Sequence, residues 1–188
     1  MRYSFVLLLA TVGLLQGCVP VVAAGVGTGI LMSASDRRSA GAMIEDDTIE
    51  TKAQKRIDEK YKDTGHASVT AYNRFALVTG TAANETAKMD IERIVGAIPN
   101  VKGIANELVV GNAASIGSTT SDTRITANVK MRFVKSPAFK ADHVKVVTEN
   151  GVVYLMGLVT RAEADAASEI ASTTANVQKV VRVFEYID

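Results

Sequence analysis

Few side chains in this 188-residue chain are of the types that carry out chemistry. It has one cysteine, Cys18, and two histidines, His66 and His143. No cluster at metal-ligand spacing surrounds the histidines, and no GxSxG nucleophile motif is present. The acidic run EDD (45–47) favours the first turn of a helix, where carboxylates complement the helix dipole, over a catalytic pair. We therefore expect surface histidines, no enzyme activity, no metal and no cofactor.

Cys18 stands at the end of residues 1–17, which have a basic Arg2 and an apolar core over 5–15. This layout is typical of a secretory signal peptide, and the core is shorter than the roughly 20 residues of a membrane-spanning helix. The letters LQGC (15–18) resemble the lipobox of bacterial lipoproteins. The resemblance implies cleavage before Cys18, a diacylglyceryl group on its sulfur and, with Val19 next, sorting to the outer membrane.

The charge balance, 21 basic and 20 acidic residues, excludes a general nucleic-acid binder, which needs a basic excess. We also expect no small-molecule substrate. Residues rich in Gly, Ala and Ser follow Cys18 without helical or strand periodicity, which favours a flexible tether.

An internal repeat occupies the rest of the chain. VTAYNRFALVTG (69–80) aligns with VVTENGVVYLMG (146–157) at an offset of 77, and other segments align at 76. We predict the following parts: signal peptide 1–17, lipidated N-terminus and tether 18–42, first domain 43–111, linker 112–120 and second domain 121–188.

Each repeat begins with a helix and a hairpin. Ile49, Ala53 and Ile57 recur every four residues, and their counterparts are Ile125, Val129 and Phe133. Asn150-Gly151 is a strong signal for a two-residue hairpin turn, whereas Asn73-Arg74 predicts a longer or strained one.

A second helix and a last strand complete each repeat. The second helix of the first repeat has one apolar face, made of Ala87, Ile91, Ile94, Val95 and Ile98. Thr160 and Glu163 form a capping box before its counterpart. Last strands are predicted over 101–110 and 177–187. The fold class is α+β, with two tandem αββαβ domains, each a three-stranded sheet packed by two helices.

The first helices of the two repeats differ in charge. Residues 45–63 hold five basic and seven acidic residues, whereas residues 122–140 hold five basic residues and only Asp122 as an acid. If Ile125 and Phe133 face the core, an opposite stripe combines cations with a long apolar side chain: Arg124, Asn128, Met131 and Lys135, with Lys130 as a lesser member. This surface suits an anionic membrane, and a solvated helix face is the alternative.

The repeats resemble the BON family. Gly80 and Gly157 after the second strands, with Asn100-Val101 and Asn176-Val177 at the last strands, carry this resemblance, and together with the lipobox it extends to dual BON-domain outer-membrane lipoproteins. The resemblance implies anionic phospholipid binding through the first helix of the second domain, and a role in outer-membrane integrity near division sites. Arg124 stands where a member of the family has an aromatic residue able to insert into the membrane interface, so we expect electrostatics to dominate the binding.

A second hypothesis assigns the first domain a different role. Residues 43–111 hold nine basic and eleven acidic residues, so we expect the domain to dock an envelope protein such as outer-membrane assembly machinery. Both hypotheses can hold for one chain, with one role in each domain.

Overall fold

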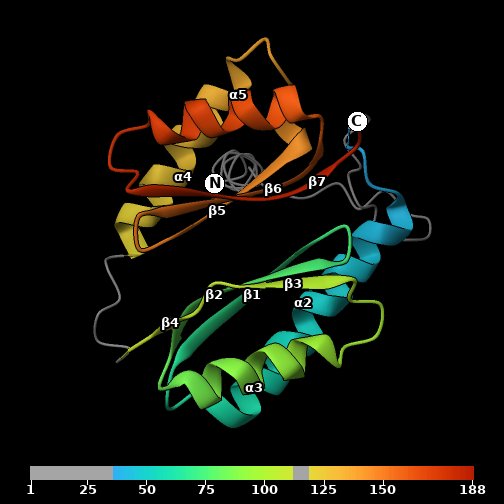
Figure 1. Cartoon of the computed structure of the whole chain (residues 1–188), viewed down its shortest axis with the longest axis vertical. Helices are drawn as coiled ribbons and strands as arrows, with labels where there is room; N and C mark the ends of the chain where they lie inside the picture. The colour runs from blue at the N-terminus through green and yellow to red at the C-terminus, as the bar shows by residue number, and fades with distance from the viewer. Residues whose placement is uncertain (1–35, 112–118) are drawn as a thin grey trace, which may run out of the picture. The chain divides into compact units, whose positions relative to one another are not determined.

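The computed structural model describes residues 36–111 and 119–188 (Figure 1). The predicted signal peptide, Cys18, residues 19–35 of the tether and residues 112–118 of the linker lie outside the described residues. The chain divides into two units, Met1–Leu31 and Met32–Asp188, and all described residues belong to the second. No helix among them is long and apolar enough to cross a membrane.

The first repeat consists of two helices and a sheet whose last strand is divided in two. Its elements are α2 (Ala40–Tyr61), β1 (His66–Tyr72), β2 (Phe75–Ala82), α3 (Glu85–Gly96), β3 (Gly103–Asn106) and β4 (Val109–Val110).

The second repeat has the same order, with a short 3-10 helix before its first strand. Its elements are α4 (Thr119–Val134), the 3-10 helix (Ala141–His143), β5 (Val144–Glu149), β6 (Val152–Val159), α5 (Arg161–Ser172) and β7 (Lys179–Tyr186). The predicted αββαβ order is therefore confirmed in both repeats.

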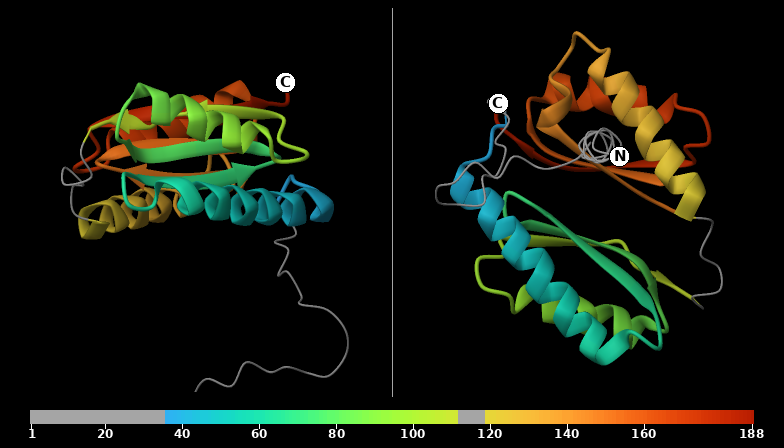
Figure 2. Two further views of the ribbon diagram at one scale, coloured as in Figure 1. Left: turned by 90° about the horizontal axis from the view of Figure 1, so that it is seen from below. Right: turned by 180° about the vertical axis from the view of Figure 1, so that it is seen from behind.

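The middle strand of each sheet is the second strand of its hairpin. The first strand of each repeat pairs with it antiparallel, and the last strand pairs with it parallel. The sheet orders are thus β1-β2-β3, with β4 also on β2, and β5-β6-β7. Each sheet carries its two helices on one face (Figures 1 and 2). A parallel last strand requires a crossover connection, which α3 and α5 provide.

Both hairpin turns have two residues in the left-handed region. The φ angles are 51° and 76° at Asn150 and Gly151, and 49° and 68° at Asn73 and Arg74. The first turn is therefore strained at Arg74, as the sequence predicted. It is not longer than the second turn, because Tyr72 pairs directly with Phe75 and leaves two residues between them. Asparagine tolerates this region well, whereas arginine does so at a cost.

The predicted apolar faces form the two domain cores. Ile49, Ala53 and Ile57 of α2 are buried with Ile91 and Val95 of α3. In the second domain the core residues of α4 pack with those of α5, which are mostly alanines: Ile125, Val129, Phe133, Ala164, Ala167 and Ala171. The small residues of α5 allow this helix to lie close to its sheet.

Gly80 and Gly157 lie inside β2 and β6, and not after these strands as the sequence suggested. A Cβ at Gly80 would stand 2.0 Å from the carbonyl oxygen of His66, and one at Gly157 would stand 2.4 Å from that of His143. Gly80 also has a φ of 113°. Close backbone approach therefore explains why glycine occupies both positions.

The first helix begins earlier than the EDD run indicated. Ser39 caps α2 by accepting from the Ala42 N–H at 3.1 Å, so residues 40–42, assigned to the tether from sequence, are helical. The EDD run is therefore in the second turn and does not cap the helix. Its middle residue, Asp46, is buried and accepts from the N–H groups of Asn73 and Arg74 at 2.8 and 2.6 Å. It fixes the hairpin turn to the helix.

A third apolar cluster contains residues of both repeats on the sheet faces that the helices leave uncovered. Its buried members are Tyr72, Leu77, Tyr154, Met156 and Leu158. Polar contacts accompany it, including an ion pair of 3.0 Å between Lys145 of β5 and Glu50 of α2. The two domains therefore share an interface built from their sheets.

Candidate functional site

The inner face of α4 holds the helix firmly on the second domain. Ile125, Val129 and Phe133 are almost completely buried, and the Phe133 ring meets Phe139 edge to face at 5.0 Å between centroids. Burial of such side chains stabilises the fold by about 1.5–3 kcal/mol each. The opposite face of the helix is therefore presented to solvent in a fixed orientation.

The N-terminal part of α4 is attached to the hairpin of the same domain. Asp122 accepts from the N–H groups of Asn150 and Gly151 at 2.8 and 2.9 Å, as Asp46 does in the first domain. Thr126 and Thr148 join their hydroxyls at 2.7 Å. The single acid of this helix region is thus used for structure, and its charge is directed towards the turn.

The predicted stripe of α4 is exposed throughout: Arg124, Asn128, Met131 and Lys135 all lie on the surface, and Met131 is 53% exposed. Lys130 is exposed too, but helical geometry places it on the flank, about 120° around the axis from Arg124. The structure thus brings four of the five predicted residues onto one face.

Val134 belongs to this face as well and was missed in the sequence. Its side chain is 74% exposed, and it is three residues from Met131, the spacing of neighbours on a helix. An i+3 step from Met131 would have found it. We call Arg124, Asn128, Met131 and Val134, together with Lys135 directly after the helix, the outer face of α4. The right-hand view of Figure 2 looks onto this helix.

Arg132, counted among the cations of this segment, has a structural role. Its guanidinium donates to the Ile170 carbonyl at 2.6 Å and to the Thr174 and Thr173 hydroxyls at 2.7 and 2.9 Å. These bonds join α4 to the C-terminal end of α5, where carbonyl groups lack helical partners. Arg132 is therefore not available to a ligand.

The remaining cations of this region are uncompensated. Within residues 36–111 and 119–188, Arg124, Lys130, Lys135 and Lys140 form no ion pair. Chemically, the outer face of α4 can hold anionic oxygens and at the same time place Met131 and Val134 against an apolar layer.

Three of the six acidic residues of α2 form contacts with other segments of the protein. Glu50 accepts from the Ala71 N–H at 2.8 Å and pairs with Lys145, while Glu45 accepts from the Asn100 amide at 2.7 Å. Asp46 pairs with Arg38 at 2.9 Å in addition to holding the hairpin turn. The charge by which we expected the first domain to dock a partner is therefore only partly used for internal contacts, because Asp47 and Glu59 remain exposed.

The two equivalent histidines have different surroundings. His66 is exposed, as expected, but His143 is only 7% exposed, so the surface expectation for His143 is wrong. Its Nδ1 lies 3.4 Å from Glu163, which also accepts two hydrogen bonds from Arg37 at 2.6 and 2.9 Å. The Arg37 guanidinium lowers the pKa of Glu163 to about 2, against the opposing effect of burial.

Arg37 and Arg38 were assigned to the tether, and sequence reasoning gave them no role. Arg37 also donates to the Leu158 carbonyl at 2.8 Å, while Arg38 lies over the Tyr72 ring at 4.2 Å and pairs with Asp36 at 2.9 Å. The segment directly before α2 is therefore fixed to both domains. No periodicity indicates such contacts, because the segment is irregular.

The chain belongs to the BON family. The family model, described as the BON domain, matches residues 45–112 and 121–188, which correspond to the two repeats. The class is therefore defined by two copies of one small α+β domain.

The relatives agree with this class. The chain is 36% identical over 185 residues to the outer membrane lipoprotein DolP of Haemophilus influenzae, covering 97% of this chain and 95% of that protein. It is 33% identical over 154 residues to the 21 kDa hemolysin of Actinobacillus pleuropneumoniae, covering 81% and 79%. The likeness to the first of these identifies an outer-membrane protein of the lipoprotein class, and none of these names describes an enzyme.

A solved structure with a weaker likeness is the C-terminal domain of CdsD, a structural protein of the type III secretion system of Chlamydia trachomatis. It is 14% identical, has a TM-score of 0.30, and covers 80% of this chain and 100% of that one.

Proposed function

We propose that this protein is anchored to the outer membrane through Cys18 and binds anionic phospholipid with the outer face of α4. The observation that carries the proposal is the combination on one rigid face of unpaired cations with two exposed apolar side chains, Met131 and Val134. Cations suit phosphate oxygens, and the apolar pair suits the boundary of the acyl chains.

The expected affinity of α4 alone is low. Each cation near an anionic surface contributes about 1 kcal/mol, so Arg124 and Lys135 of the outer face, with Lys130 on the flank and Lys140 beyond the end of the helix, together contribute about 4 kcal/mol at most. That corresponds to a millimolar dissociation constant for a free domain. A lipid on Cys18 raises the effective concentration of α4 at the bilayer, and a weak site then becomes occupied.

We propose that this second contact supports outer-membrane integrity, near division sites, without enzymatic chemistry. A protein held by one lipid group and one helix face has a defined orientation at the bilayer, which a flexible anchor alone does not give. The likeness to an outer-membrane lipoprotein over nearly the whole chain supports this role.

Binding of a tethered fragment to vesicles tests the proposal. The fragment from Ser33 onward carries an N-terminal histidine tag and is bound sparsely to nickel-chelating vesicles, with or without phosphatidylglycerol. We expect phosphatidylglycerol to increase the bound fraction, and Arg124→Glu with Lys135→Glu to abolish the increase. Raising the salt from about 0.05 M to about 0.5 M should also abolish it, because exposed charges become screened.

The matched control is Lys52→Glu with Lys55→Glu on α2, which makes the same change in charge on the equivalent helix. This variant should keep the response to phosphatidylglycerol. Equal losses in the two variants would show that net charge alone matters and would contradict a site on α4.

A further inference from the structure

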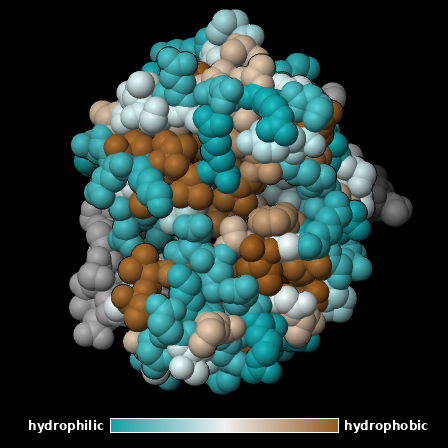
Figure 3. Space-filling view, in the orientation of Figure 1, coloured by the Kyte–Doolittle hydropathy of each residue, from teal (hydrophilic) through white to brown (hydrophobic). Residues whose placement is uncertain are grey.

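A groove with an apolar lining lies away from α4, beside the outer edge of β7. Its cavity has a volume of about 450 Å³, within the range of about 300–1,000 Å³ that is usual for ligand sites. Its apolar lining is aromatic and aliphatic: Tyr72, Phe75, Val181, Val183 and Phe184. Figure 3 shows apolar side chains gathered around a hollow in the middle of the face seen in Figure 1. We call this cavity the β7 groove.

The edge of β7 that borders the groove has free backbone groups. The Ile187 N–H donates to the Val159 carbonyl of β6 at 3.2 Å. Because successive N–H groups of a strand point to alternate sides, those of Glu185 and Val183 point to β6 as well. The N–H groups of Arg182 and Phe184 then point away from β6, and no hydrogen bond reaches them from any of the described residues.

The outer edge of β1, in contrast, is covered by side chains. On β1 the N–H groups of Val69 and Ala71 donate to Gln54 and Glu50 of α2. Proteins usually blunt their edges in this way, because an open edge is a template for another strand. The eight-residue β7 has no such cover in the part of the chain that the structure describes.

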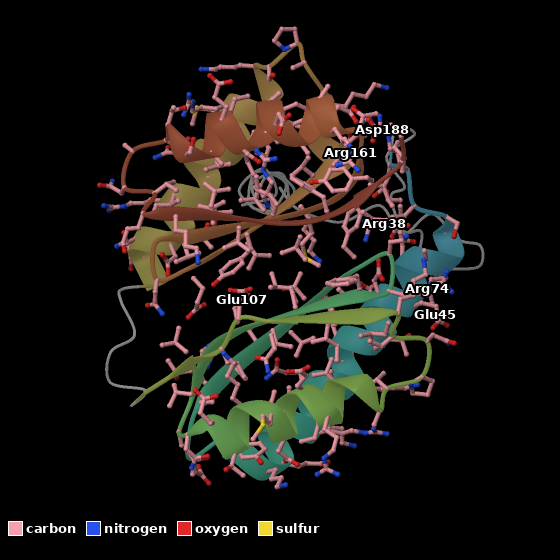
Figure 4. The ribbon with its side chains drawn as sticks, in the orientation of Figure 1. Arg38, Glu45, Arg74, Glu107, Arg161 and Asp188 are labelled. Carbon is pink, nitrogen blue, oxygen red and sulfur yellow. The ribbon has the colours of Figure 1, made fainter. Side chains whose placement is uncertain are left out.

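The charges at the groove favour a basic occupant. Glu107 and Glu185 line it, and Figure 4 shows Glu107 in the space between β3 and β7. The one cation of the lining, Arg182, is already paired with Asp165 at 2.7 Å. An occupant with lysine or arginine side chains would complement the two carboxylates.

We propose that the β7 groove binds an extended basic segment of a partner protein, which adds to the second sheet as a fourth strand beside β7. Its backbone pairs with the outward N–H and C=O groups of Arg182 and Phe184. Alternate apolar side chains enter the groove against Tyr72 and Phe75, and a cation reaches Glu107. Strand addition of this kind obtains affinity from the backbone and specificity from the pockets for alternate side chains.

A synthetic peptide tests this proposal on the chain from Cys18 onward, held in nanodiscs of neutral phosphatidylcholine so that the peptide has no anionic lipid to bind. The probe has about seven residues of alternating valine and lysine, a usual strand length. Its control has the same side chains, but the amides that would face β7 are N-methylated. We expect the control to bind at least about tenfold more weakly in a fluorescence anisotropy titration.

Amide hydrogen exchange locates the contact. The peptide should slow exchange at Arg182 and Phe184, while exchange at Val183, already bonded to β6, changes little. Glu107→Lys should weaken binding about tenfold. Glu169→Lys, an equal charge change on the exposed side of α5, should not.

Equal binding of the methylated and unmethylated peptides would overturn the proposal, as would equal effects of the two lysine variants. Oleate provides a further test. If oleate displaces the peptide and by itself slows exchange at no amide of β7, the groove takes a single acyl chain, and this result would also contradict strand addition. Circular dichroism of each variant shows whether it is folded, and the N-methyl comparison needs no variant.

Discussion

At the repeat offset of 76, Met131 and Val134 of α4, and Lys135 directly after it, correspond to Lys55, Asp58 and Glu59 of α2. The inner faces of the two helices, in contrast, carry apolar residues at the same positions and are equally buried. The shared fold constrains the face that meets the sheet and leaves the other face free to diverge. A difference between repeats on that free face is therefore a better guide to function than any feature they share.

The largest effects should come from the shared inner faces. Phe133→Ala should lower the free energy of unfolding by about 3–5 kcal/mol, and the equivalent Ile57→Ala by about 2–5 kcal/mol, because each leaves a cavity in a closed core. Denaturant unfolding measures both. A loss below about 1 kcal/mol in only one of them would show that the two helices are not equivalent in packing.

The acids that hold the hairpin turns should come next. Asp122→Ala removes the acceptor of two N–H groups and should cost about 2 kcal/mol. Asp46→Ala should cost about 3 kcal/mol, because it also leaves Arg38 without one of its partners. The exposed neighbour Asp47→Ala is the control, with a change within about 0.5 kcal/mol. An equal cost at all three positions, measured by thermal unfolding, would contradict these roles.

Two arginines of α4 should separate stability from binding. Arg132→Gln should destabilise the protein by about 1–3 kcal/mol, because three acceptors at the end of α5 lose a charged donor. Arg124→Gln should leave stability within about 0.5 kcal/mol and weaken vesicle binding. Unfolding and vesicle binding are measured on the same samples. If Arg124→Gln destabilised the protein and Arg132→Gln weakened only vesicle binding, these assignments would be wrong.

A smaller effect on stability, which depends on pH, should come from Glu163 of α5. The pKa of Glu163 is lowered to about 2 from an ordinary value of 4.5, chiefly by Arg37. Its contribution to stability is therefore fully present above about pH 4.5 and is lost as the pH falls towards 2. Glu163→Gln should cost about 1 kcal/mol at neutral pH, allowing for solvent screening, and should flatten the loss of stability over that range. An unchanged pH profile would contradict the Arg37 contact.

Sequence periodicity predicted the fold well because each repeat buries regular stripes. The helices with Ile49 and Ile125, the hairpins, the capping box of Thr160 and the existence of the last strands all depend on local patterns, whereas the parallel pairing of the last strands does not and was not predicted. The exposed stripe of α4 was accessible by the same reasoning, since the residues opposite a buried face are exposed.

What sequence reasoning missed depends on contacts between distant segments. Arg132 was counted toward the positive charge of residues 122–140, and nothing in its sequence neighbourhood shows that α5 supplies three acceptors for it. His143 was expected on the surface because its partner Glu163 is 20 residues away and on another element. Val134 was missed for a simpler reason. The predicted stripe stepped by four residues from Met131 to Lys135 and left out the i+3 position, which Val134 occupies.

The most direct test of the account places a dye on the two corresponding helix faces. The lipid that we propose on Cys18 would block its thiol, so Met131→Cys and Lys55→Cys would each provide a single site for an environment-sensitive fluorophore. In nanodiscs with phosphatidylglycerol we expect the emission at position 131 to shift to the blue and position 55 to stay as in neutral lipid. Equal emission at the two positions would contradict membrane binding by the outer face of α4.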